Sequence, residues 1–317
     1  MAKIPPPNSH TALAIDAAHG AAAWGGDSAG VPMSAVTHPC DRAIWYAYRW
    51  APEPEKATGA RQRRFRTGNQ YERWLLDDLR AIGCEVYEVD ETTGKQFRIS
   101  LAGGHLNGKI DAVVIGLPEA KKVAHITECK SHNDKSYKAL VKVGVRESKP
   151  DHYAQFQLYM HGEGLTRALY MAANKNTDEI HCERVHYDPV FCLALISKIE
   201  RIVAASQPPA KLHEDPSKKA AFVCQFCRSY GICHGGEFSR VNCRTCISST
   251  PVDGGKWICE RHNKELSYKE QVAACPDHLY IPGLVHGEQI DSDFSDEGGT
   301  ITYQMHDGST WIDGRRE

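Results

Sequence analysis

An acid, a second acid and a lysine in the first half of the chain have the spacing of a metal-dependent hydrolytic site. Asp111 closes the segment Gly-Lys-Ile-Asp, and Glu128-Cys129-Lys130 follows further along. The alternation of a strand sends Glu128 and Lys130 to the same face. If that strand lies beside the Asp111 strand, two carboxylates and one ammonium converge at one edge. Carboxylate oxygens suit Mg²⁺ or Mn²⁺, which would polarise a phosphate ester and activate bound water.

A Glu-x-Lys triplet also occurs on ordinary surface strands, so the triplet alone carries little information. The upstream Asp111, after its own predicted strand, favours the chemical interpretation over the structural one. Two further pieces fit the same site. The segment Gly68-Asn69-Gln70-Tyr71-Glu72 is expected to open a helix before the sheet. Gln155 and Tyr159 stand four residues apart, which puts both on one helix face.

The hydrophobic periodicity predicts the elements that position these residues. Their order, with helices before, between and after strands, indicates an α/β protein with a central mixed sheet flanked by helices. The predicted helices cover Cys40–Arg49, Asn69–Ile82, Lys135–Val143, Asp151–His161 and Val190–Ala205. The predicted strands cover Cys84–Val89, Gln96–Leu101, Gly108–Ile115, Val123–Cys129, Ala168–Ala173 and Ile180–Tyr187, and a hairpin is expected over Thr300–Asp313.

Four of the twelve cysteines form a second pattern: Cys40 stands near the start, and Cys224, Cys227 and Cys233 read C-x2-C-x5-C far downstream. Disulfides are disfavoured in a reducing compartment, so clustered spacing indicates metal. Four thiolates suit an iron–sulfur cluster. Zinc in the same thiolates is the alternative, and Cys40 could also be an ordinary buried cysteine.

A third cysteine pattern, within residues 240–282, predicts a structural zinc site. Cys243 and Cys246 form a C-x2-C pair, and Cys259 is expected on a returning strand after two glycines. The fourth ligand stays open among Cys275, His262 and His278. We favour Cys275, because an unpaired thiol there would lack a purpose.

Composition excludes several protein classes. The 317 residues are 41% hydrophobic and 25% charged, with a net charge of -2, which is an ordinary globular balance. No apolar run approaches the ~20 residues of a membrane helix, and the start lacks a signal peptide's apolar core. We therefore expect a cytoplasmic protein without a membrane partner. Basic runs at 61–66 and 130–149 fit a polyanion-binding groove, or else solvated helix faces.

The ordered set of acids, lysine, glutamine and tyrosine resembles the RecB-like branch of the PD-(D/E)xK nuclease superfamily over about residues 35–235. The resemblance implies a restriction-endonuclease-like core. It implies divalent metal held by Glu72, Asp111 and Glu128 with the Cys129 carbonyl, a catalytic Lys130, and Gln155 and Tyr159 orienting the site and contacting DNA. Two residues depart from the pattern, because Ile110 rather than proline precedes Asp111 and Glu72 stands where many iron–sulfur members have histidine. Glu72 as a solvated acid and Tyr159 as a core aromatic stay open.

Cys40, in Thr-His-Pro-Cys, resembles the early cysteine of the iron–sulfur RecB-like nucleases, such as the AddB subunit and the CRISPR-associated adaptation nucleases. The resemblance implies that a structural [4Fe–4S] cluster is held by Cys40, Cys224, Cys227 and Cys233. It also implies a setting in phage-type DNA recombination or processing, with DNA as partner and a recombination or replication protein beside it.

These patterns divide the chain into a flexible N-terminal segment (1–30), a nuclease core closed by the four-cysteine cluster (31–236), and a zinc-binding module with an acidic tail (237–317). The hypothesis is a metal-dependent DNA nuclease, in particular an exonuclease acting on ends or single strands. The alternative is a catalytically silent iron–sulfur and zinc adaptor that binds nucleic acid. A redox enzyme lacks a flavin or nicotinamide fingerprint.

Overall fold

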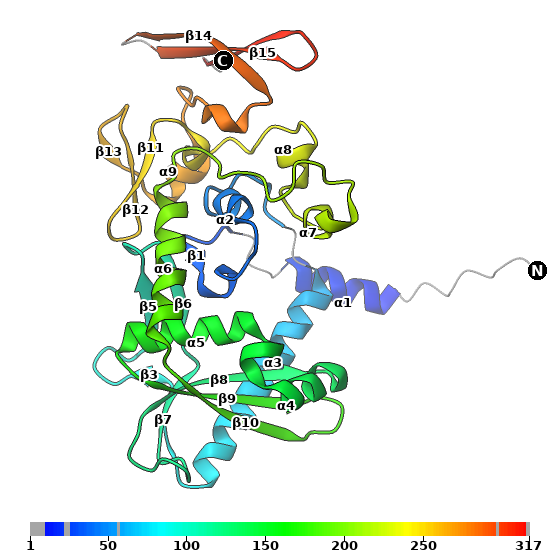
Figure 1. Ribbon diagram of the computed structural model, residues 1–317, viewed down its shortest axis with the longest axis vertical. Helices are drawn as coiled ribbons and strands as arrows, with labels where there is room; N and C mark the ends of the chain where they lie inside the picture. Colours follow the sequence, from blue (N-terminus) through cyan, green and yellow to red (C-terminus); the bar gives the residue numbers. More distant parts are fainter. Residues whose placement is uncertain (1–9, 22–25, 56–57, 296–297, 315–317) are drawn as a thin grey trace, which may run out of the picture.

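A five-stranded mixed sheet lies at one end of the computed structural model (Figure 1), which describes residues 10–21, 26–55, 58–295 and 298–314. The strand order is β10-β9-β8-β7-β2. Only β8 and β9 run parallel, and the other neighbours are antiparallel. The strands are β2 (Glu85–Tyr87), β7 (Ala112–Ile115), β8 (His125–His132), β9 (Arg167–Asn174) and β10 (Ile180–His186). The predicted α/β class with a central mixed sheet flanked by helices is therefore confirmed.

Helices cover both faces of this sheet, and the strands β8 and β9 are accordingly buried over most of their length on both sides. On one face Leu75, Leu76 and Leu79 of α3 (Gly59–Ala81) pack in a cluster with alternate residues of β7, β8 and β9. The other face packs against α4 (Asp134–Ser148) and α5 (Pro150–Glu163), with α6 (Pro189–Ala204) behind them. Burial of one strand pair between two helical layers thus fixes which side chains of β8 point to which layer.

Helix α3 is longer than predicted, and the expected start at Asn69 is wrong. The helix begins at Gly59, where the Thr58 side chain caps it by accepting a hydrogen bond from the Arg61 backbone. The run of arginine and glutamine has high helix propensity, which outweighs the roughly 1 kcal/mol cost of Gly68 in mid-helix. The basic run is therefore continuous with the helix that carries Glu72.

The predicted strand 108–115 is split into two strands by Ile110 and Asp111. Its first part belongs to β6 (Leu106–Lys109), which pairs with β5 (Arg98–Leu101) and with β1 (Val31–Pro32) in a separate three-stranded sheet. Its second part is β7 of the central sheet. The chain therefore changes sheets at Asp111, and a short hairpin of β3 (Val89–Asp90) and β4 (Lys95–Gln96) lies nearby in the sequence.

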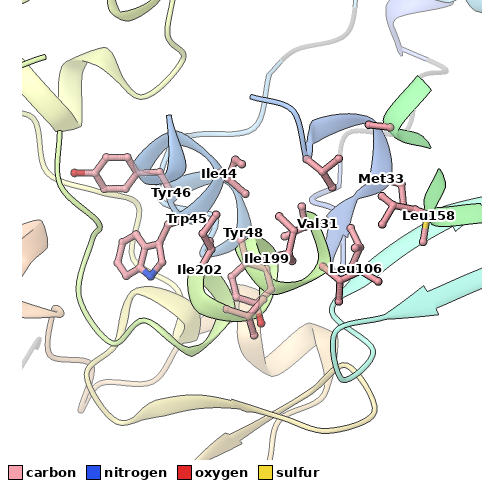
Figure 2. Packing of buried hydrophobic residues seen from close by; sticks show 14 of the residues in the cluster. Val31, Met33, Ile44, Trp45, Tyr46, Tyr48, Leu106, Leu158, Ile199 and Ile202 are labelled. Atoms are coloured by element: carbon pink, nitrogen blue, oxygen red, sulfur yellow. The ribbon is translucent and has the colours of Figure 1, made fainter. Parts of the chain in front are cut away.

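The main core lies between the small sheet and two helices, α2 (Asp41–Tyr48) and α6. Figure 2 shows Trp45 and Tyr48 of α2 packed toward Ile199 and Ile202 of α6, with Val31 and Leu106 close by. The remaining helical pieces are α1 (His10–Ala21), η1 (Met33–Ala35), η2 (Lys219–Ala221), α7 (Phe222–Gln225) and α8 (Tyr230–His234). In the proposed flexible segment, α1 is helical, while residues 1–9 and 22–25 lie outside the described residues.

The last third of the chain adds two small sheets. The first consists of β11 (Ser249–Val252), β12 (Lys256–Cys259) and β13 (Lys264–Glu265), next to η3 (Cys243–Thr245), α9 (Tyr268–Ala273) and η4 (Pro282–Leu284). The second, at the far end in Figure 1, consists of β14 (Gly287–Ser295), β15 (Gly298–Met305) and β16 (Thr310–Gly314). The hairpin predicted over 300–313 is present as β15 and β16. The acidic tail falls partly in β14, with residues 296–297 outside the described ones.

Among the described residues, no helix combines the length and the apolar character that crossing a bilayer would require.

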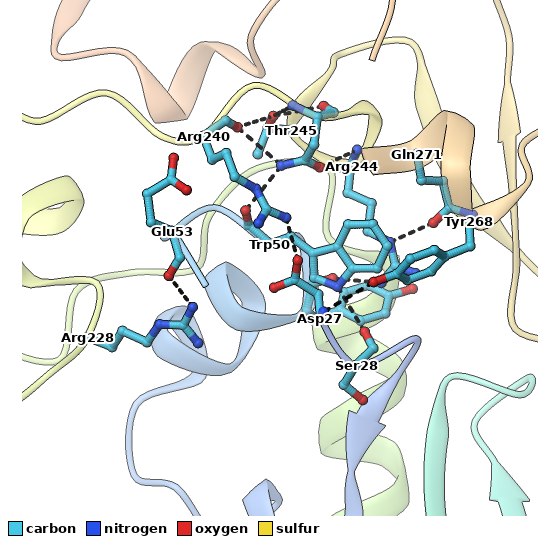
Figure 3. A network of polar contacts seen from close by, with 12 residues as sticks. Asp27, Ser28, Trp50, Glu53, Arg228, Arg240, Arg244, Thr245, Tyr268 and Gln271 are labelled. Carbon is cyan, nitrogen blue, oxygen red and sulfur yellow. Dashed lines mark hydrogen bonds and ion pairs between the residues drawn. The ribbon is translucent and has the colours of Figure 1, made fainter. Parts of the chain in front are cut away.

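A buried arginine joins these terminal residues to the main core (Figure 3). Arg244 is 1% exposed, and its guanidinium carbon lies 3.7 Å from the Trp50 ring centroid and 4.7 Å from that of Trp257. The guanidinium donates to the Tyr48 carbonyl at 2.9 Å and to the Gln271 side chain at 2.8 Å. Burial lowers the pKa of Arg244 to about 9. Such a cation stays charged only because aromatic faces and carbonyls replace water.

Replacing Arg244 with lysine should destabilise the protein strongly. The ammonium lacks the planar fork that meets several acceptors between two indole rings, and breaking a buried charge network costs about 3–5 kcal/mol. The free energy of unfolding from urea denaturation measures the effect. Lys256→Ala, which removes an exposed ion pair with Glu265, serves as the control and should cost less than about 1 kcal/mol. Equal losses for the two variants would contradict the assigned role of Arg244.

Candidate active site

The candidate site lies where one edge of β8 becomes free. On one side β8 pairs with β9 as far as His132, whereas on the other side its pairing with β7 stops at Thr127. The chain before β7 turns away to the other sheet, and the Asp111 side chain takes over: its Oδ2 accepts a hydrogen bond from the Cys129 backbone at 2.9 Å. The change of sheet at Asp111 therefore brings this acid beside the Glu128–Lys130 segment.

Glu128 and Lys130 form an ion pair at this edge, in which the Glu128 side chain is buried and the Lys130 side chain is 30% exposed. Lys130 Nζ donates to Glu128 Oε1, and Glu128 is only 4% exposed. Glu128 Oε2 is also buried, and it has no hydrogen-bond partner among the described residues. Burial raises the pKa of Glu128 to about 7, although Lys130 opposes the shift. Burial pulls the pKa of Lys130 down, but the Glu128 and Asp111 carboxylates outweigh it and raise the pKa above its usual value.

Glu72 and Asp111 complete a group of three acids. Burial raises the pKa of Asp111. Burial and the nearby Asp111 carboxylate raise the pKa of Glu72, which is half-buried on α3. Glu128 in turn feels both of these carboxylates. The structure therefore brings together Glu72, Asp111, Glu128 and Lys130, from one helix and two strand ends, in one electrostatically coupled cluster.

Helix α5 contributes the predicted glutamine and tyrosine. Gln155 Nε2 donates to the Tyr159 hydroxyl at 2.5 Å. Burial and the Glu128 carboxylate raise the pKa of Tyr159, which therefore stays a neutral phenol. The ring is almost fully buried, as a core aromatic would be, yet its hydroxyl faces the acids. Gly108 explains the close approach, because a Cβ there would lie 2.6 Å from the Tyr159 ring.

The donor set fits a divalent cation that prefers oxygen ligands. The carboxylates of Glu72, Asp111 and Glu128 influence one another electrostatically, although no three of their oxygens in the described structure lie within 4.8 Å of one another. Glu128 also holds a buried oxygen that no described group satisfies, an arrangement that costs free energy unless a cation completes it. The Cys129 side chain points into the α3 layer, where burial raises the pKa of its thiol well above the usual value. Only the backbone of Cys129 therefore faces the acids of the candidate site.

Sequence reasoning missed a buried polar group beside the site. The Tyr170 hydroxyl lies 2.8 Å from both His132 Nε2 and His152 Nδ1. These three residues come from β8, α5 and β9, so no local spacing links all of them. One signal was available, since His132 follows Lys130 by two residues and shares its strand face. Burial lowers the pKa of each histidine to about 4, so both rings are neutral at pH 7.

These histidines predict a loss of stability in acid. A base whose pKa falls on folding stabilises the folded state above its ordinary pKa of 6.5, and this contribution is lost as the pH falls toward 4. Between about pH 7.5 and pH 5, the double variant His132→Gln/His152→Gln should lose roughly 4 kcal/mol less unfolding free energy than the parent protein, about 2 kcal/mol for each histidine. Urea denaturation at both pH values measures this difference. His161→Gln, an exposed control, should keep the parent's pH dependence, and an unchanged slope in the double variant would refute the prediction.

The four cysteines of the first group lie together. Cys40, Cys224, Cys227 and Cys233 line one hollow, together with Arg42 and Tyr46 of α2. Among the described residues, no three of these sulfur atoms lie within 4.8 Å of one another, and the same holds for Cys243, Cys246, Cys259 and Cys275. The four thiols of the first group therefore face one common space.

The second cysteine group also comes together. Burial raises the pKa of Cys243 to about 12, with the Cys246, Cys275 and Cys259 thiols adding to the shift. The most closely set group of donor atoms in the described structure is nearby: Cys275 Sγ lies 3.6 Å from His262 Nε2, which lies 3.6 Å from Asp277 Oδ2. Sequence reasoning missed Asp277. His278 is buried, with its Nε2 3.2 Å from the Thr245 hydroxyl.

No family model matches the chain, and no curated protein matches it. Among solved structures, LHK-Exo in complex with dAMP has a TM-score of 0.41 and 17% identity, covering 56% of this chain and 87% of its own. The alkaline exonuclease LHK-Exo from Laribacter hongkongensis has a TM-score of 0.38 and 15% identity, covering 61% and 91%. SSO0001 has a TM-score of 0.39 and 13% identity, covering 71% and 97%.

Proposed function

We propose that this protein is a divalent-metal-dependent deoxyribonuclease that hydrolyses phosphodiester bonds at the free edge of β8. The observation that carries the proposal is the cluster of Glu72, Asp111 and Glu128 around Lys130, with Glu128 Oε2 buried and lacking a described partner. A buried carboxylate oxygen of this kind is costly unless a cation or a protonated group meets it. Mg²⁺ or Mn²⁺ held by the three carboxylates, with the Cys129 carbonyl, fits that requirement.

Each residue of the site has a separate role in the proposed hydrolysis. The bound cation would supply charge for the phosphate and lower the pKa of water. The Lys130 ammonium, kept protonated by its acidic neighbours, stabilises the negative charge that develops on the phosphorus oxygens. Gln155 and the neutral Tyr159 hydroxyl, which are hydrogen-bonded to each other, keep the Glu128 side chain in position. Water adds to phosphorus and gives up one proton to solvent, the bond to the leaving sugar oxygen breaks, and that oxygen takes a proton from solvent.

The substrate class follows from the charged surface beside the acids. A hollow next to the site is lined by Arg63, Arg64, Lys175 and Ser131, the residue that follows Lys130. Phosphate contacts from such cations give salt-sensitive binding that is independent of sequence. We therefore propose DNA as substrate, attacked from an end or as a single strand. A role in phage-type DNA recombination or processing, with a recombination or replication protein as partner, rests on the family resemblance.

Activity of two site variants tests the proposal. Asp111→Asn and Lys130→Met should each lower Mn²⁺-dependent degradation of end-labelled DNA by about 10²–10³-fold, because each removes a charge aimed at the reacting group. Asp77→Asn and Lys256→Met remove similar charges from exposed ion pairs and should leave the rate unchanged. Degradation at the parent rate by both site variants would refute the catalytic assignment of these residues. A parent protein that binds DNA but never degrades it would favour the silent adaptor.

We also propose a structural [4Fe–4S] cluster on Cys40, Cys224, Cys227 and Cys233, supported by the hollow that the four cysteines share and by the resemblance of their spacing to iron–sulfur RecB-like nucleases. Protein purified without oxygen should carry about four iron atoms and absorb near ~400 nm. Cys40→Ser should lose most of this iron, whereas Cys182→Ser, which changes an exposed cysteine outside the group, should keep it. One zinc and no iron at this site would refute the assignment.

For the second group we propose one structural zinc ion on Cys243, Cys246, Cys259 and Cys275, with His262 as the rival fourth ligand because of its closeness to Cys275. Thiolate coordination at both sites suits the reducing cytoplasm. The same elemental analysis reads this site independently, since it should return one zinc per chain in both the parent and Cys40→Ser.

A further inference from the structure

One face of α3 changes its surroundings halfway along the helix. Arg61, Phe65, Gly68 and Glu72 follow one another at intervals of three and four residues, so they share a face. Further along, the same face carries Leu75, Leu76 and Leu79, which are buried against the central sheet. In the first half of the helix this face is open. Phe65 is 53% exposed, and a Cβ built on Gly68 would meet no atom of the described residues within 4 Å.

Two hollows that contain arginines flank this open face. One is lined by Arg61, Gln62 and Phe65 of α3 and by Arg228 from the segment after α7, together with the acids Asp27 and Glu55. The other is lined by Arg63, Arg64 and Lys175 and reaches Ser131 beside the catalytic lysine. An exposed aromatic ring between arginines is the arrangement with which proteins hold single-stranded nucleic acid, because bases stack on the ring while cations meet the phosphates.

Arg61 is poised for such a phosphate. Its guanidinium carbon lies 5.6 Å from the Phe65 ring centroid, and its Nη1 pairs with Glu55 at 2.6 Å. Both partners of this ion pair are exposed, so the pair adds little free energy, and a DNA phosphate could take the place of the Glu55 carboxylate at small cost. The acid and the ring together hold the guanidinium over the edge of the open face.

We infer that Phe65 is a base-stacking residue for single-stranded DNA, set about three nucleotides from the bond that is cut. Seven residues of helix separate Phe65 from Glu72, a rise of about 10.5 Å, and a stacked strand advances about 3.4 Å per nucleotide. The distance in nucleotides rests on the proposed function, because it is counted from the acid cluster. The stacking itself rests on the ring, the open space at Gly68 and the flanking arginines.

Trp74 provides a matched control on the same helix. It is 53% exposed, like Phe65, but its position in the helical repeat turns it to the opposite face. Its ring packs edge-on against Tyr71, with centroids 5.3 Å apart, and it lines neither hollow. If any exposed aromatic on α3 sufficed for binding, the two residues would behave alike.

The experiment measures binding of a fluorescent single-stranded oligonucleotide by the full chain carrying Asp111→Asn, so that DNA stays intact. Adding Phe65→Ala should weaken binding about tenfold to hundredfold. Phe65→Trp should stay within about twofold of the parent, because it keeps an aromatic face, and Trp74→Ala should not change the affinity. In the protein that carries only Asp111→Asn, the fluorescence of 2-aminopurine placed about three nucleotides from the DNA end should be quenched. Adding Phe65→Ala should remove this quenching.

Two groups of results would overturn the inference. One is that the parent fails to bind the single strand, or that Phe65→Ala binds as tightly as the parent. The other is that Trp74→Ala loses as much affinity as Phe65→Ala. Failure of the proposed function is read separately, from the nuclease assay on the protein without Asp111→Asn. A protein without nuclease activity that still needs Phe65 for binding would keep the stacking assignment and refute the catalytic one.

Discussion

The ion pair between Glu128 and Lys130 is the constraint on which the rest of the site depends. Glu128 is buried at the edge of β8 and Lys130 is partly exposed there, and the ammonium opposes the rise in the Glu128 pKa that burial causes. The pair forms because β7 leaves the sheet at Asp111, which frees one edge of β8 and lets an acid replace the missing strand. The change of sheet at Asp111 therefore places the Asp111 carboxylate where it raises the pKa of both Glu128 and Lys130.

Two helices meet this edge from opposite sides of the sheet. Helix α5 carries Gln155 and Tyr159 on the side of Glu128, while α3 brings Glu72 from the other layer. Helix α3 also lines the two hollows that contain arginines. In the proposed function, one rigid helix would therefore hold the acids and the surface that meets DNA in a fixed relation.

Local patterns predicted much of this arrangement. The alternation in Glu128-Cys129-Lys130 gave the shared face correctly, and the spacing of Gln155 and Tyr159 placed both on α5. The start of α3 could not be found, because Gly68 and Asn69 look like a helix start while Thr58 supplies the actual cap. The change of sheet at Asp111 also escaped, since a single apolar run crosses it. The group of His132, His152 and Tyr170 depends on tertiary contacts between three elements, which no periodicity encodes.

The setting of Arg244 also bears on how the chain acquires its structure during synthesis. The guanidinium lies between Trp50, made early, and Trp257, made late, and it binds the carbonyl of Tyr48. Domains generally fold as units while the nascent chain leaves the ribosome. Here the first third of the chain emerges with an indole face that only residues beyond 240 can cover. Native packing around α2 therefore has to await most of translation, and a prematurely terminated product would present that aromatic surface to chaperones and proteases.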